Sequence, residues 1–253
     1  MWLQYRSLAA SRTWPRIEET GFRVFSQFDE DGKLLFAMAA LGIRDGRFLD
    51  IGSGDGIRSN CANLALNFGW TGVYMDGDAD SIRRGRTFYR THADSWAHPP
   101  QFLFAMVTRE NINQLIQSSG VGDVELMSID IDGNDYWIWE AINCINPKVV
   151  VIEARIEFGS RSIVVPYDAG HAYPGPHPDY FGGSLTAMAK LANTKGYRLV
   201  GANSYGFNLI FVRQGCGEEA LPEVTVDSVM RHPRNAARAA IFDRIKDLPY
   251  VEV

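Results

Sequence analysis

The chain has 253 residues, of which 46% are hydrophobic and 22% are charged, and its formal net charge is −5. This composition is typical of a globular protein and argues against a polyanion-binding surface, so we do not expect nucleic acid as a substrate. A chain of this length can bury one sizeable core, which predicts a single domain.

Cysteine usage and hydropathy indicate the compartment. Cys61, Cys144 and Cys216 lie far apart without paired spacing, which favours reduced thiols over a disulfide framework or a zinc site. The first residues lack the apolar core of a secretion signal, and no segment approaches the roughly 20 apolar residues that span a bilayer. We therefore expect a cytoplasmic protein without a membrane partner.

The first motif is a polar turn at 25–32, Phe-Ser-Gln-Phe-Asp-Glu-Asp-Gly, followed by an apolar helix predicted over 34–41. Taken alone, its acidic residues are typical N-cap residues for that helix. The next motif, at 48–56, is an apolar run that leads into a turn with Gly52, Gly54 and Gly56. The run predicts a buried parallel strand, and glycines allow a tight turn and close approach to a ligand, so we expect a nucleotide-bearing cofactor here.

The following strand, at 72–78, places Asp76 twenty residues after Gly56. A carboxylate at this position can hold two ribose hydroxyls. A dinucleotide-binding loop has the spacing Gly-x-Gly-x-x-Gly, whereas these glycines alternate, and we expect Asp55 to face and repel a phosphate. An NAD(P)-dependent oxidoreductase is therefore the disfavoured alternative.

Helices and strands alternate along the rest of the chain, which predicts an α/β fold with a mostly parallel sheet and helices on both faces. After the strand and turn at 48–56 and the strand at 72–78, the predicted strands are 102–107, 124–130, 149–154, 197–200 and 208–212, and the predicted helices are 57–68, 79–90, 110–118, 136–142 and 184–195. The last two strands are expected to form a closing β-hairpin.

Carboxylates follow two strands that we expect to be neighbours. Asp130 and Asp132 lie on one face if the extended geometry persists, and Glu153 ends the next strand. Such a cluster suits Mg²⁺, Mn²⁺ or Ca²⁺, which would acidify a substrate hydroxyl, and without a metal one carboxylate can act as the general base. The alternative is that Asp132, Asn134 and Asp135 form a turn and cap the next helix.

Residues 156–183 contain many prolines, glycines and aromatic residues and predict a lid over an acceptor pocket. The expected contacts are Tyr167, His171, Tyr173, His177 and Tyr180. His171 is a candidate base, although most loop histidines are simply exposed.

The glycine loop with Asp50 resembles motif I of class I S-adenosylmethionine (SAM) dependent methyltransferases. This resemblance implies a Rossmann-like fold with a seven-stranded sheet in which the last strand is antiparallel and inserted. It also implies that Asp50 and Gly52–Gly56 hold the methionine end of SAM, that Asp76 and Gly77 hold the ribose, and that residues near Thr108 contact the adenine.

Ser26-Gln27, the Glu30-Asp31-Gly32 cluster, the glycine loop and the segment 128–135 together resemble the FkbM-type small-molecule O-methyltransferases over residues 25–213. The resemblance implies that Gln27 and Glu30 or Asp31 lie at the cofactor. That family usually has Asp-x-Glu-Gly after strand four, whereas this chain has Asp130-x-Asp132-Gly. Magnesium-dependent sugar and antibiotic O-methyltransferases end strand five with Glu-Asp, and the Glu153-Ala154 present here means that a metal site needs another donor.

We expect residues 1–46 to form an N-terminal helical segment over the cofactor pocket, 47–214 the SAM-binding core with its lid, and 215–253 a tail that covers a sheet edge or forms a homodimer contact. The predicted function is methyl transfer from SAM to oxygen on a small polar acceptor, such as a sugar or natural-product hydroxyl. Asp130, Glu153 and His171 would orient or deprotonate the acceptor, and Asp130, Asp132 and Glu153 would hold a Mg²⁺ ion. The second alternative is a non-catalytic relative that only binds SAM.

Overall fold

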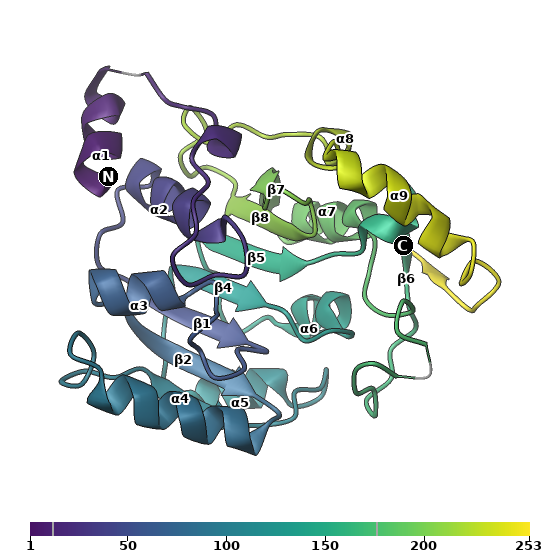
Figure 1. Cartoon of the computed structure of the whole chain (residues 1–253), viewed down its shortest axis with the longest axis horizontal. Coiled ribbons are helices and arrows are strands. Elements are labelled where there is room, and N and C mark those ends of the chain that lie inside the picture. The colour runs from purple at the N-terminus through teal and green to yellow at the C-terminus, as the bar shows by residue number, and fades with distance from the viewer. Residues whose placement is uncertain (12, 176) are drawn as a thin grey trace.

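The computed structural model describes residues 1–11, 13–175 and 177–253, with side chains described except at 9–11, 234, 236 and 239. Its centre is a seven-stranded sheet with the order β3-β2-β1-β4-β5-β8-β7 (Figure 1). The strands are β1 Arg47–Ile51, β2 Thr71–Asp76, β3 Gln101–Phe104, β4 Leu126–Ile129, β5 Val149–Glu153, β7 Tyr197–Ala202 and β8 Asn208–Arg213.

Strand directions complete the topology. The pairs β1 with β2, β1 with β4, β2 with β3 and β4 with β5 are parallel, whereas β8 runs antiparallel to both β5 and β7. An antiparallel last strand inserted beside β5 is the predicted arrangement, so the class I methyltransferase fold is confirmed.

Helices cover both faces of the sheet, as predicted (Figure 1). One face packs against α2 (Glu30–Ala40), α3 (Ala62–Phe68) and α4 (Ala79–Thr91), and the other against α5 (Ile112–Ser119), α6 (Asp135–Ala141) and α7 (Leu185–Thr194). Because both faces are buried, the central strands are continuous apolar runs such as Val149–Ile152.

The helix predicted over 57–68 begins only at Ala62. The preceding residues form turns because the Ser59 hydroxyl donates a hydrogen bond to the Asp50 carboxylate and accepts one from the Cys61 N–H. The side chains that follow the glycine loop are therefore held at the strand ends instead of on a regular helix face.

The N-terminal helices do not themselves cover the strand ends. Helix α1 (Trp2–Ser11) packs on α2, with the Tyr5 and Phe36 ring centroids 5.2 Å apart, and a 3-10 turn, η1 (Ile17–Glu19), follows it. Among the described residues of 1–46, the contribution to the cavities at the predicted cofactor region comes from the loop before α2, where Gln27 and Phe28 are lining residues.

The segment 156–183 packs against the C-terminal tail. The lid segment contains η2 (Ile156–Phe158) and β6 (Ile163–Val164), and the tail contains α8 (Val226–Val229), α9 (Pro233–Phe242) and β9 (Val251–Glu252). Strand β6 pairs antiparallel with β9, and α9 packs against η2. The tail also covers the sheet edge, as predicted, because the Val224 N–H donates to the Leu199 carbonyl oxygen of edge strand β7 (2.8 Å). No helix in the described part of the chain has the length and apolar character needed to cross a bilayer.

Candidate active site

Three adjoining cavities lie at the carboxyl ends of the parallel strands. The glycine-loop cavity, of about 470 Å³, is bordered by Gly52, Gly54 and Asp76. The small cavity, of about 60 Å³, lies beside Asp50, and the acidic cavity, of about 420 Å³, lies beside Glu153. Asp130 lines all three cavities, so they adjoin one another at this residue.

The glycine loop has the backbone that its sequence predicts. Gly52 has φ +82° and Gly54 has φ +55°. A Cβ at Gly52 would lie 1.7 Å from the Asp130 carbonyl oxygen, so only glycine lets the β1 loop approach the end of β4 this closely. Gly56 does not line the cavities, and its carbonyl accepts a hydrogen bond from the buried Tyr89 hydroxyl (2.7 Å). Its contribution is to hold the loop.

Asp76 lines the glycine-loop cavity with its carboxylate oriented by two backbone groups. Its Oδ2 accepts from the Gly54 N–H and its Oδ1 from the Asp78 N–H, both at 2.7 Å. Gly77 is also in the lining, and a Cβ there would lie 2.3 Å from the Met106 sulfur. The absence of a Cβ at Gly77 is therefore what admits the Met106 side chain.

Thr108 does not line this cavity, in contrast to the prediction. Its N–H donates to the Asn111 side-chain oxygen (2.8 Å), next to the start of α5. The lining comes instead from Ala105, Met106 and Val107, immediately after β3, and Met106 is 58% exposed. We predicted that this strand ends at residue 107, whereas β3 ends at Phe104. The residues that line the cavity therefore come before Thr108 in the sequence.

Asp50 lies at the base of the small cavity and is 3% exposed. Burial, with a further contribution from the charge of Asp76, raises its pKa to about 6. Arg58 and Asn60 share this cavity, and Asn60 donates to the Ser128 hydroxyl (3.1 Å). Sequence reasoning missed both residues because it assigned them to a helix, although their position directly after the glycines was an available signal.

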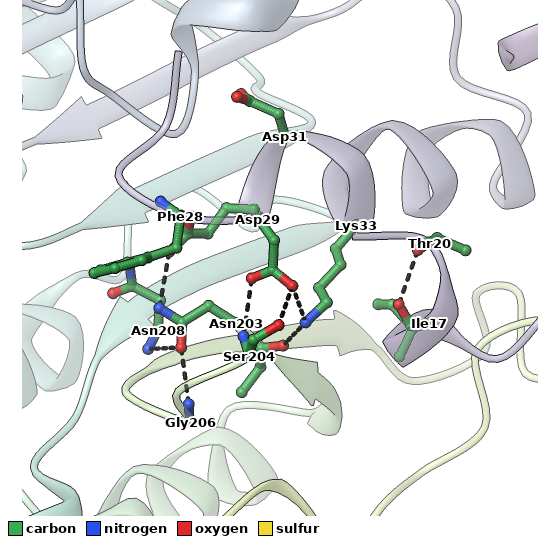
Figure 2. Close-up of polar contacts among 12 residues, drawn as sticks. Ile17, Thr20, Phe28, Asp29, Asp31, Lys33, Asn203, Ser204, Gly206 and Asn208 are labelled. Atoms are coloured by element: carbon green, nitrogen blue, oxygen red, sulfur yellow. Dashed lines mark hydrogen bonds and ion pairs between the residues drawn. The ribbon is translucent and has the colours of Figure 1, made fainter. Parts of the chain in front are cut away.

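Gln27 lines both the small and the acidic cavity, and the acidic residues after it hold its loop in place. Figure 2 shows Asp29 and Lys33 of this region facing the turn between β7 and β8. Glu30 is completely buried, and its Oε1 accepts from the side-chain amides of Asn203 and Asn208, both at 2.9 Å. The turn before α2 is therefore bound to a hairpin more than 170 residues away in sequence.

Asp31 points away from that network in Figure 2 and contacts its own loop. Its Oδ2 accepts from three successive backbone N–H groups, those of Val24 (2.7 Å), Phe25 (2.7 Å) and Ser26 (2.9 Å). Asp31 lines none of the three cavities, so the structure does not support its predicted place at the cofactor.

A carboxylate cluster forms at the ends of β4 and β5. One oxygen atom from each of Asp130, Asp135 and Glu153 lies within 4.8 Å of the other two. The predicted cluster contained Asp132, but Asp135 takes that place. The prediction depended on extended backbone through Asp132, which instead has φ +52°. Asp132 instead lines the glycine-loop and acidic cavities.

Asp135 was predicted only as a turn or cap residue, but it also belongs to the carboxylate cluster. It starts α6, and its carboxylate accepts from the Ile131 N–H (2.9 Å) and the Gly133 N–H (3.0 Å). It is therefore a turn-forming residue and a member of the cluster at the same time.

The cluster is electrostatically strained. Burial raises the pKa of Asp130 and of Glu153 well above the usual carboxyl range, and repulsion between the cluster carboxylates raises both pKa values further. Glu153 Oε2 has no hydrogen-bond partner in the described part of the protein. A shared proton, a bound cation or a hydrogen-bond donor on a ligand would relieve this strain.

Asp55 does not face the ligand cavities, in contrast to the expectation. Its carboxylate accepts from the Ile57 N–H (3.0 Å) and lies 3.9 Å from Arg84 of α4. The negative charge that would oppose a pyrophosphate comes instead from Asp76, Asp130 and Asp132, which do line the glycine-loop cavity.

Two of the five predicted lid contacts line the site. Tyr173 borders both large cavities, and His171 borders the glycine-loop cavity but not the acidic one. The His171 Nε2 atom is 2.9 Å from the Asp132 carbonyl oxygen, so this ring anchors the lid to the turn after β4. This placement does not support His171 as the base for an acceptor in the acidic cavity.

The other three aromatic lid residues have structural contacts. The Tyr167 hydroxyl donates to Glu110 (2.8 Å), the His177 Nδ1 accepts from the Asp179 N–H (3.2 Å), and Tyr180 packs on Tyr250. They fix the lid segment rather than the ligand.

No protein-family model and no curated protein matches the chain. A similar solved structure is a SAM-dependent methyltransferase from Methanosarcina mazei, with 13% identity, 67% of this chain and 93% of that chain covered, and a TM-score of 0.40. Another, from Clostridium acetobutylicum, has 10% identity over 72% of this chain and 89% of that chain, with a TM-score of 0.44. A third, from Geobacter sulfurreducens in complex with S-adenosylhomocysteine, has 16% identity over 73% of this chain and 70% of that chain, with a TM-score of 0.40. The fold assignment rests on the strand order and directions described above.

Proposed function

We propose that this protein is a SAM-dependent methyltransferase that transfers a methyl group to an oxygen of a small polar acceptor, such as a sugar or natural-product hydroxyl. The observation that supports this most is that three cavities at the strand ends adjoin at Asp130, which lines each of them. The motif resemblance to FkbM-type O-methyltransferases supports oxygen as the acceptor atom.

The residues of the glycine-loop cavity fit the adenosine part of SAM. Gly54 borders this cavity, and a Cβ built there would meet no described atom within 4 Å, which leaves space beside the loop for a ligand. The fixed Asp76 carboxylate would accept from the ribose hydroxyls, and Met106 and Gly77 would flank the adenine.

The small cavity fits the methionine end. Asp50 would accept from the ammonium group and Arg58 would pair with the carboxylate, and both residues line this cavity. A cationic ligand beside Asp50 would also favour its ionised form, which burial otherwise disfavours.

The acidic cavity would hold the acceptor. SAM supplies a methyl group on a sulfonium, and an oxygen lone pair forms the new carbon–oxygen bond as the carbon–sulfur bond breaks and its electrons remain on sulfur. The hydroxyl proton would pass to the Asp130–Glu153 cluster, because burial raises the pKa of both carboxyls and so makes an ionised member a stronger proton acceptor than an exposed carboxylate. Tyr173 and the lid would exclude water and orient the acceptor.

A divalent cation at the cluster is the alternative to a carboxylate base within this proposal. The oxygen atoms of Asp130, Asp135 and Glu153 are close enough to share one ion, and Asp135 supplies the donor that Ala154 does not. The unpartnered Glu153 Oε2 is consistent with the oxygen ligands that magnesium prefers. When bound, the cation would acidify the acceptor hydroxyl.

Calorimetric titration with SAM and S-adenosylhomocysteine tests the proposal, with NAD as the control ligand. We expect SAM and S-adenosylhomocysteine both to bind with micromolar affinity. Asp76→Ala should weaken both affinities by at least about 10-fold, because the ribose loses its hydrogen bonds. Asp80→Asn, which changes an exposed carboxylate on α4, is the matched control and should bind normally. A calorimetric titration of magnesium into the wild type and into Glu153→Gln tests the proposed cation site independently of SAM binding.

Each contrary result identifies an alternative. Tight NAD binding would favour the oxidoreductase, and the absence of binding to all three ligands would remove the methyltransferase proposal. SAM binding without methyl transfer to any acceptor in a broad hydroxyl panel would favour a non-catalytic relative.

A further inference from the structure

The lining of the acidic cavity contains more carboxyl groups than guanidinium groups. Four carboxylates line it, against two guanidinium groups, those of Arg155 and Arg238. Both arginines pair with the same oxygen, Glu157 Oε1, at 3.3 Å from Arg155 and 2.9 Å from Arg238. The other three carboxylates, Asp130, Asp132 and Glu153, make no ion pair with an arginine or lysine in the described part of the chain.

Unpartnered atoms are an independent sign of a ligand. Glu157 is only 3% exposed, yet its Oε2 has no hydrogen-bond partner among the described residues. Glu153 Oε2 is also buried without a hydrogen-bond partner among the described residues. A buried carboxylate oxygen without a donor is costly, so a ligand that brings donors to both residues would recover this cost.

The cavity walls also suit a cation. The Arg155 guanidinium lies 3.9 Å from the Phe181 ring centroid, so one aromatic face of this cavity already holds a positive charge. Phe28 and Phe207, whose ring centroids are 5.4 Å apart, supply further aromatic surface. Aromatic rings beside carboxylates are a common setting for binding organic ammonium groups.

We infer that the methyl acceptor is an amino alcohol or amino sugar, whose protonated amine binds towards Glu157 and Glu153 while its hydroxyl lies towards Asp130. This inference rests on the proposed function and names its substrate class. A protonated amine brings both donors and a positive charge to the unpartnered carboxyl oxygens, whereas a neutral polyol brings donors alone. A hydroxyl or ring oxygen of the same ligand can accept from Arg155 Nε, which is buried and also has no hydrogen-bond partner among the described residues.

The test is calorimetry on the full chain saturated with S-adenosylhomocysteine, in buffer with EDTA so that no divalent cation neutralises the cluster. Two matched pairs of probes differ only in their charged group: tyramine against tyrosol, and glucosamine against N-acetylglucosamine. We expect the amine of at least one pair to bind about 10-fold more tightly than its neutral partner, as a partly buried ion pair allows.

Two variants have opposite expected effects. Glu157→Gln should weaken amine binding about 10-fold and leave the neutral probe unchanged, because one carboxylate charge is removed. Arg238→Gln, in which a side chain that is 45% exposed loses its charge, should strengthen amine binding several-fold. Neither residue lines the glycine-loop or small cavity, so both variants should bind S-adenosylhomocysteine normally.

Equal affinities within both probe pairs, or no amine binding at all, would overturn the inference. An unchanged or weakened amine affinity in Arg238→Gln would do the same, and this variant keeps the test valid if Glu157→Gln fails to fold. Failure of S-adenosylhomocysteine to bind the wild type is a different result, because it removes the proposed function itself.

Discussion

Asp50 shows how burial sets the behaviour of a single side chain in this site. It is 3% exposed, and its main polar partner is the Ser59 hydroxyl, so burial raises its pKa from 3.8 to about 6. The folded protein therefore holds the Asp50 proton more tightly than the unfolded chain does. This tighter proton binding stabilises the folded state, and the stabilisation is fully present below pH 3.8 and is lost as the pH rises through 6.

Asp50→Asn removes this titration and should flatten part of the pH dependence of stability. Relative to the wild type, the variant should gain up to about 3 kcal/mol in free energy of unfolding between pH 4 and pH 7, since each pKa unit is worth about 1.4 kcal/mol. Urea unfolding across this range measures the difference. A difference between Asp50→Asn and the wild type that stays constant across this pH range would contradict a raised pKa of Asp50.

At the scale of elements, the contact between the start of α2 and the β7–β8 turn holds Gln27 over two cavities. Glu30 carries this contact, because it accepts from the Asn203 and Asn208 amides and from the Phe28 N–H. The charged residues of the turn thus join two segments, whereas the N-cap residue of α2, Asp29, makes no side-chain capping hydrogen bond and contacts Ser204 and Lys33 instead.

Glu30→Ala should lower the free energy of unfolding by about 2–4 kcal/mol, because it leaves two buried amides without an acceptor. Glu18→Ala, at a half-exposed side chain on η1, should change stability by less than about 0.5 kcal/mol. Urea unfolding of both variants makes the comparison. Equal losses would show that the buried network adds nothing to stability.

At the scale of the whole molecule, the lid segment and the tail share a small core apart from the main sheet. Phe158 and Ile163 of the lid segment pack with Phe242 and Ile245 of the tail. The same packing brings α9 close enough for Arg238 to reach Glu157 at the acidic cavity. The tail therefore contributes to the candidate acceptor site, in addition to the sheet-edge or homodimer contact that we predicted for it.

Phe242→Ala should open this small core selectively. The lost packing should cost about 3 kcal/mol locally and raise hydrogen exchange in 156–165 and 233–253, while β1, β4 and β5 keep their protection. Phe211→Ala, in the main core, should instead weaken protection throughout the sheet. Identical exchange patterns for the two variants would mean that the small core unfolds only with the whole protein.

The strand and helix pattern was predictable because it depends on local periodicity. Continuous apolar runs such as 149–154 and 208–212 became the central strands β5 and β8, with ends within one residue of prediction. The predicted helix 57–68 lost its first turn, because the contact of Ser59 with Asp50 competes with regular helix hydrogen bonds. Propensity alone does not contain such a contact.

The sequence by itself determined the sheet, the glycine loop, the position of Asp76 and the gathering of carboxylates at the strand ends, because strand periodicity and parallel topology bring these together. Only the tertiary structure decided which carboxylates meet. The left-handed backbone at Asp132 replaces that residue with Asp135 in the cluster, and the docking of α9 brings Arg238 to Glu157 across 81 residues of sequence. Both results depend on the packing of distant segments, which no local pattern encodes.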